Sequence, residues 1–142
     1  MARHIMLNGT IMPSDTPCLS YDNRGLLWGD SFTVKLRGNS CIVYDFRSNF
    51  QCICKMAESM GMEAPDSFKP KIFANDLLLL LRKNRIYKEF AATLTIFRNS
   101  SGTTKSLVRT HFQHLFRLKI CRMSSTASTR TVFLPTFSIR QK

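Results

Sequence analysis

The alternation of apolar and polar residues from position 31 onward constrains the fold more than any other feature of the sequence. In "SFTVKLRGNSCIVYDF", three apolar residues alternate with three polar ones: Phe32, Val34 and Leu36 against Thr33, Lys35 and Arg37. Successive side chains of a strand point to opposite faces, so the pattern predicts a half-buried strand. "RGNS" is typical of a turn into a returning strand from Cys41 to Tyr44.

Two segments farther along have helical periodicity. The apolar residues of the first recur at helical spacing, which predicts a helix from Phe46 to Met60, capped by Asp45 and ended by Gly61. In the second, Pro70 occupies a first-turn position and a leucine-rich stripe runs on to about Asn84.

Short strands flank these helices. Asn8-Gly9 is typical of a tight hairpin turn within "HIMLNGTIMPSD", and "AATLTIF" at 91–97 predicts a buried strand. The order of strands, two helices and a strand predicts an α+β fold, a small antiparallel sheet with two helices packed on it. We expect a small domain over residues 1–102, followed by an irregular or partly helical basic tail over 103–142, where "LVRTHFQHLFRLKI" could form a basic amphipathic helix.

The positive charge is unevenly distributed. The net charge is +12; residues 1–89 carry 12 Lys/Arg and all 9 Asp/Glu, whereas residues 90–142 carry 9 Lys/Arg and no acid. A cationic tail can bind nucleic acid by releasing counterions from phosphates. The run at Leu77–Leu81 is far shorter than the roughly 20 residues that a membrane span requires, so we expect no membrane association.

The five cysteines are an odd set, and "MARHIMLNG" lacks the apolar region of a signal peptide. We therefore expect reduced thiols and a cytoplasmic protein. Cys52 and Cys54 do not have the Cys-x2-Cys spacing of zinc sites, and the three histidines have no partners at ligand spacing, so no metal site is predicted.

The stretch "YDNRGLLWGD" at 21–30 predicts a turn from Asp22 to Gly25, then three candidates for burial, Leu26, Leu27 and Trp28, before Gly29-Asp30. Together with "LNGTIMPSD", "MAESMGM", "LLLLLRKNRI" and "TLTIFRNSSG", this passage resembles the N-terminal small domain of fold-type IV pyridoxal-phosphate enzymes. That family includes branched-chain and D-amino-acid aminotransferases and aminodeoxychorismate lyase. The resemblance covers residues 5–102.

The resemblance implies roles for four residues. It places Trp28 as an aromatic on the substrate side of the cleft and turns Thr33, Lys35 and Arg37 toward the substrate. The residues themselves also allow core packing for Trp28 and a solvated strand face for Lys35 and Arg37. Thr33, Val34 and Lys35 depart from the family's usual Phe, Glu and small residue, so substrate preference does not carry over.

The resemblance also implies pyridoxal phosphate as cofactor, a homodimer, and amino-acid or aminodeoxychorismate-like substrates. However, the position of the family's phosphate-binding arginine is Cys52, and a thiol does not replace a bidentate cation. The family's Schiff-base lysine comes from a larger second domain that has no counterpart after Gly102. We therefore expect a truncated relative that is inactive alone, does not bind the cofactor covalently and has no catalytic residue of its own. A frame shift after codon 102, testable in the gene's other frames, would explain the tail.

The alternative is a nucleic-acid-binding protein that uses residues 103–142 as a cationic arm. It predicts that DNA or RNA retention in a gel shift weakens steeply with salt and is lost when the arm is removed. Equal retention of the full and shortened chains would leave the arm no role.

Overall fold

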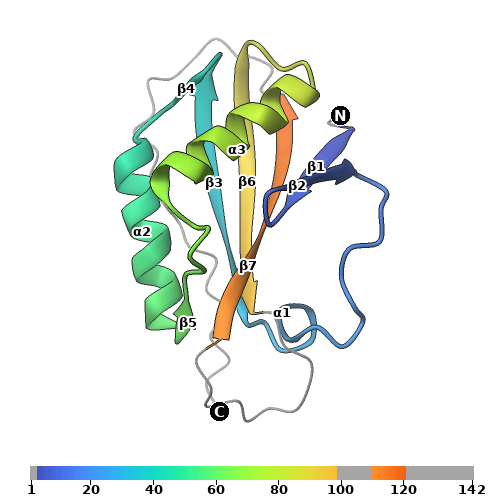
Figure 1. The fold of residues 1–142 in the computed structure, drawn as a ribbon, viewed down its shortest axis with the longest axis vertical. Helices are drawn as coiled ribbons and strands as arrows, with labels where there is room; N and C mark the ends of the chain where they lie inside the picture. Colours follow the sequence, from blue (N-terminus) through green and yellow to red (C-terminus); the bar gives the residue numbers. More distant parts are fainter. Residues whose placement is uncertain (1–2, 99–109, 121–142) are drawn as a thin grey trace, which may run out of the picture.

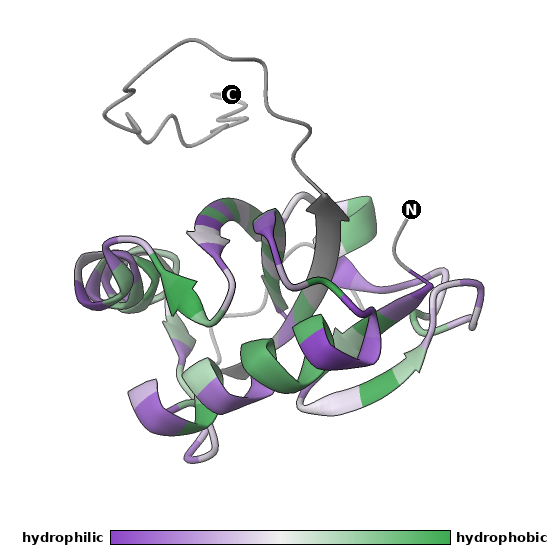
Figure 2. Ribbon diagram, turned by 90° about the horizontal axis from the view of Figure 1, so that it is seen from above, coloured by the Kyte–Doolittle hydropathy of each residue, from purple (hydrophilic) through white to green (hydrophobic). Residues whose placement is uncertain are grey.

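The computed structural model, which describes residues 3–98 and 110–120, has two layers. One is a seven-stranded sheet, and the other is a pair of helices on a single face of that sheet (Figures 1 and 2). The strand order is β2-β1-β7-β6-β3-β4, with the short β5 beside β7. All pairs are antiparallel except β5 with β7. The predicted α+β class is confirmed.

The elements in chain order are β1 (His4–Leu7), β2 (Thr10–Pro13), α1 (Arg24–Leu27), β3 (Ser31–Asn39), β4 (Ile42–Val43), α2 (Phe46–Ser59), β5 (Met62–Glu63), α3 (Pro70–Lys83), β6 (Glu89–Arg98) and β7 (Thr110–Ile120). As far as residue 98, the predicted strands and the two long helices occur in the order that the sequence predicts, and α1 and β5 are additions that it does not predict.

Turn chemistry explains most of the boundaries. Asn8 and Gly9 both have positive φ, 50° and 82°, as a two-residue hairpin turn between β1 and β2 requires. Gly61, with φ 69°, follows α2 as predicted. The predicted cap at Asp45 is wrong: its backbone is left-handed, with φ 49°, and its side chain makes no capping hydrogen bond. A capping side chain needs an extended backbone at that position.

The core lies between the helices and one face of the sheet. Every second residue of β3 and β6 is buried against the apolar stripes of α2 and α3. Aromatic rings fill the space where the two helices meet: the centroids of Phe50 and Phe68 are 5.1 Å apart, and those of Phe50 and Phe73 are 5.5 Å apart. The helices thus cover one sheet face and define which side of β3 stays open.

Residues 110–120 correct the sequence analysis. We expected this segment to be irregular or partly helical, but it forms β7, which lies between β1 and β6 inside the sheet (Figure 1). Its register runs from Phe90 opposite Ile120 to Arg98 opposite Phe112. Interstrand hydrogen bonds along β6 outweigh any helical tendency of this segment. The sheet therefore extends past the boundary predicted at residue 102; the structure does not describe residues 99–109 and 121–142.

The hairpin turn is attached to β7 through Asn8. Its backbone N–H donates to the carbonyl of His114 at 3.0 Å, and its Oδ1 accepts from the His114 N–H, also at 3.0 Å. The His114 side chain is buried, with its ring 5.2 Å from that of Phe68. Burial lowers the pKa of His114 from 6.5 to about 4.

This burial predicts a pH-dependent stability. Because the folded pKa lies below the unfolded value, the free energy of unfolding is highest above pH 6.5 and falls as the pH drops toward 4. The loss from this group is at most about 3 kcal/mol, since one pKa unit corresponds to about 1.4 kcal/mol. Urea denaturation between pH 7.5 and 4 checks this, with His114→Phe as the comparison. An equally steep loss in that variant would contradict the assignment to His114.

Candidate functional site

The open face of β3 carries three of the predicted site residues. Thr33 is half-buried, Lys35 and Arg37 are exposed, and the intervening residues are buried in the core. The structure therefore places Thr33, Lys35 and Arg37 on one face, as the alternation predicts. Both long helices lie on the other face (Figure 1), so neither of them covers these side chains.

The neighbouring strand keeps this face small and polar. Across β6, Thr33 lies opposite Thr95, Lys35 opposite Thr93, and Arg37 opposite Ala91. The hydroxyls of Thr33 and Thr95 are 3.4 Å apart. No carboxylate lies directly opposite either cation on β6, but Glu89, which pairs with Asn39, lies on the same face and diagonally beside Arg37. Whether Lys35 and Arg37 contact a substrate or only water stays a prediction.

Trp28 does not pack in the core. It caps the C-terminus of α1, where its N–H donates to the Arg24 carbonyl at 2.9 Å, and 52% of the residue is exposed. Leu26 and Leu27 are 64% and 56% exposed. The prediction that these three residues are buried is therefore wrong, because the single turn of α1 points its buried side chain, Arg24, inward instead. Exposure leaves the cleft role of Trp28 open.

An ion cluster fixes the stretch "YDNRGLLWGD" against the sheet. The Asp30 carboxylate lies 2.8 Å from Nε of Arg24 and 3.3 Å from Nε of Arg98. Only 8% of either arginine side chain is exposed, against 27% for Asp30. Arg98 also donates to the Met60 carbonyl at 2.7 Å, at the C-terminal end of α2. One carboxylate thus joins α1, the start of β3 and the end of β6, and Arg98 links them to α2.

Sequence reasoning missed this cluster. The sequence analysis assigned Asp30 only to a turn and gave Arg98 no role. Whether an arginine is buried depends on partners that can be distant in sequence, so the local pattern does not reveal it. Asn23, rather than Asp22, caps α1, with its Oδ1 accepting from the Gly25 N–H at 2.9 Å. The sequence offered one signal: the acid Asp30 stands just before a predicted strand, while Arg24 lies in the preceding turn and Arg98 follows another strand.

The described residues do not fit the cofactor's phosphate. Cys52, the position to which the resemblance assigns the family's arginine, is half-buried on α2, and its thiol lies 3.9 Å from the Met56 sulfur. Two sulfur atoms supply neither positive charge nor strong donors for a phosphate. Arg47, the nearest cation earlier on α2, is exposed. No step through pyridoxal phosphate can therefore be derived from these residues.

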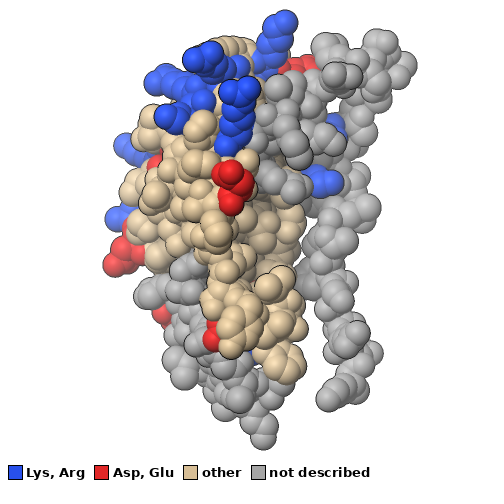
Figure 3. All heavy atoms as spheres, turned by 90° about the vertical axis from the view of Figure 1, so that its right-hand side faces the viewer, with Lys and Arg blue, Asp and Glu red and all other residues tan. Residues whose placement is uncertain are grey.

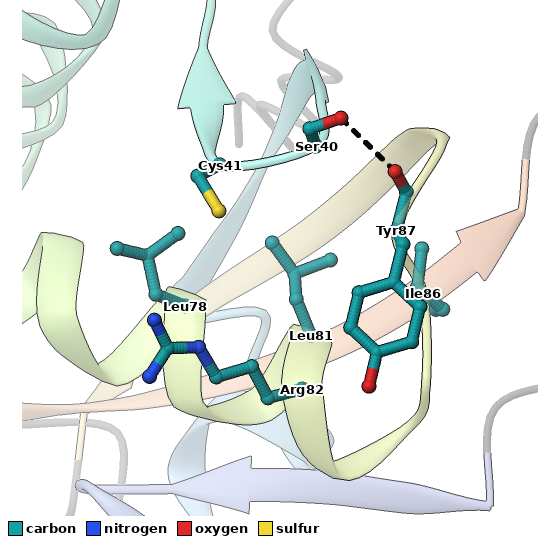
Figure 4. Close-up of a pocket in the computed structure, with 7 residues that line it drawn as sticks. All are labelled: Ser40, Cys41, Leu78, Leu81, Arg82, Ile86 and Tyr87. Carbon is teal, nitrogen blue, oxygen red and sulfur yellow. Dashed lines mark hydrogen bonds between the residues drawn. The ribbon is translucent and has the colours of Figure 1, made fainter.

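A small pocket lies on the helical side, between the β3–β4 turn and the end of α3 (Figure 4). Its volume is about 230 Å³, and it is lined by Ser40, Cys41, Leu78, Leu81, Arg82, Ile86 and Tyr87. The Ser40 hydroxyl donates to the Tyr87 carbonyl at 3.0 Å. These lining residues include no carboxylate or imidazole, and the described residues contain no group of three or more metal-ligating side chains.

The fold is similar to that of branched-chain aminotransferases. The enzyme from Thermoproteus uzoniensis, solved with norvaline, is 10% identical with a TM-score of 0.73, covering 84% of this chain and 41% of the enzyme. The enzyme from Thermobaculum terrenum, in its PLP form, is 9% identical, with a TM-score of 0.69, covering 86% and 41%. The Escherichia coli enzyme is 16% identical, with a TM-score of 0.71, and the match covers 85% of this chain and 42% of the enzyme.

These similarities confirm the predicted resemblance at the level of fold. The chain spans about two fifths of the length of these aminotransferases. No protein-family model and no curated protein sequence matches it. No helix among the described residues is both long enough and apolar enough to cross a membrane.

The ion cluster predicts a large effect of Asp30→Asn. The substitution leaves two buried guanidinium groups without their shared carboxylate, so we expect the free energy of unfolding to fall by about 2–4 kcal/mol. Urea denaturation at pH 7 measures it. Asp15→Asn, at an exposed position, removes the same charge and should cost less than about 0.5 kcal/mol. An equal fall in the free energy of unfolding in the two variants would show that the ion cluster does not stabilise the fold.

Proposed function

We propose that this chain forms the small domain of a fold-type IV pyridoxal-phosphate enzyme, an aminotransferase or aminodeoxychorismate lyase. The observation that carries the proposal is the TM-score of 0.73 over 84% of the chain with a branched-chain aminotransferase. A fold hosts many functions, so the open face of β3 is the second support. It presents a hydroxyl and two cations where the resemblance places the substrate.

In this proposal, Thr33, Lys35 and Arg37 line the cleft, with Trp28 at its edge. Cations with no carboxylate directly opposite them on β6 suit a substrate that carries a carboxylate. Such substrates are amino acids or aminodeoxychorismate-like molecules. The exposed apolar cluster of Leu26, Leu27 and Trp28 is a surface that a second subunit could cover, which favours a homodimer.

The proposal also states that this chain does not bind the cofactor covalently by itself. A Schiff base requires a lysine held in a site that excludes water and orients the cofactor. Lys35 lies on an exposed strand face, and the Cys52 position supplies no cation for the phosphate.

Borohydride trapping tests this statement. After incubation with pyridoxal phosphate, reduction and digestion, mass spectrometry should find the label at low occupancy over several surface lysines. Lys35→Arg serves as the control, because it removes the one lysine of the proposed cleft and should leave the pattern otherwise unchanged. Stoichiometric labelling of a single lysine, at position 35 or elsewhere, would overturn the proposal that the chain does not bind the cofactor covalently.

The nucleic-acid alternative requires a shorter cationic arm than the segment 103–142 that the sequence predicts. Residues 110–120 form β7 inside the sheet, so removing 103–142 would also remove a central strand. A gel shift that tests the arm should therefore compare the full chain with a chain ending at residue 120. Loss of retention on this shortening would support the alternative, and equal retention would reject it.

A further inference from the structure

Cations from two distant segments meet at the C-terminal end of α3. A depression of about 620 Å³ is lined there by Arg3, His4, Arg82, Lys83, Asn84 and Arg85. Figure 3 shows Lys and Arg side chains gathered at the upper end of the face that includes it. All four Lys/Arg side chains are exposed. The depression is separate from the open sheet face and does not depend on the function proposed above.

Asn84 holds the two segments together. Its Oδ1 accepts from the His4 N–H at 2.9 Å, and its Nδ2 donates to the carbonyls of His4 at 3.1 Å and Leu80 at 3.0 Å. This clamp joins the start of β1 to the end of α3 across 80 residues of sequence. The backbone therefore fixes the segment of Arg3 beside that of Arg82, Lys83 and Arg85, which reduces the entropy lost when a ligand binds.

The four cations of the depression have no carboxylate partner among the described residues. Residues 90–142 contain no Asp or Glu, so the segments outside the description bring no acidic side chain. The negative end of the α3 dipole favours Arg82 and Lys83 in the last turn, but Arg3 lies outside the helix, as does Arg85, whose φ is 56°.

We propose that this depression binds a small ligand that carries two or more adjacent phosphate groups. Four cations converging on one concave site offer charge-assisted hydrogen bonds to several phosphate oxygens at once. The localised shape favours a compact oligophosphate over a long polyanion, which needs a groove that follows its backbone. Arg82 also borders the apolar pocket of Figure 4, so the site has an apolar neighbour on one side.

Calorimetric titration of the full chain with tripolyphosphate at low salt tests the proposal. We expect one site per chain, weakened by added salt. The double variant Arg82→Gln/Lys83→Gln should bind about tenfold or more weakly, because each lost charge-assisted contact is worth on that order. The matched control, Lys69→Gln/Lys71→Gln, removes the same charge from the opposite, exposed end of α3 and should stay within about twofold of the unmodified chain.

The variant Asn84→Ala tests whether the position of the cations matters in addition to their charge. It removes no cation, so weaker binding in a variant that still unfolds cooperatively would support the clamp as a positioning element. If that variant does not fold, the comparison of the two double variants still tests whether the ligand binds in the depression. Equal losses in both double variants, or several weak sites per chain, would overturn the proposal. So would a single-stranded oligonucleotide that binds the depression more tightly than tripolyphosphate at equal phosphate concentration, because the occupant would then be a nucleic acid.

Discussion

The two-residue repeat of β6 is the constraint on which the rest of the structure depends. This strand pairs with β3 on one side and β7 on the other, and Phe90, Ala92, Leu94 and Ile96 are almost fully buried. A shift of one residue would turn these side chains to the open face. The same register therefore holds α2 and α3 on one side and leaves Thr33, Lys35 and Arg37 on the other.

Local chemistry made much of this fold predictable. Asn8-Gly9, Pro70 and the alternation in β3 each specify a structure within a few residues, and all three predictions are confirmed. The pattern of β7 was harder to recognise, because His114, a residue that ionises near neutral pH, occupies a buried position among apolar residues. The burial of Trp28 was wrongly predicted for a related reason. In the one-turn helix α1 it is Arg24 that is buried, beside Asp30 and the sequence-distant Arg98.

The ion cluster holds together elements from four parts of the chain. Asp30, Arg24 and Arg98 keep the turn, the sheet and α2 in one arrangement, independently of any ligand at the Cys52 position. An arrangement can survive without its chemistry, since packing and buried charge hold it in place. Of the cations at the end of α3, Arg82 and Lys83 belong to the helical layer, on the side of the sheet opposite to the open face.

The place of β7 between β1 and β6 has a consequence for the order of assembly. In the sheet, β1 joins the remaining strands through β7, and the turn residue Asn8 bonds to His114 across 106 residues. The hairpin leaves the ribosome before the other strands of the sheet, yet it cannot complete its sheet contacts until residue 116, the partner of Met6, has been synthesised. The first strands of the sheet are thus among the last to be held in place, and the loop that must close to join Asn8 to His114 spans 106 residues.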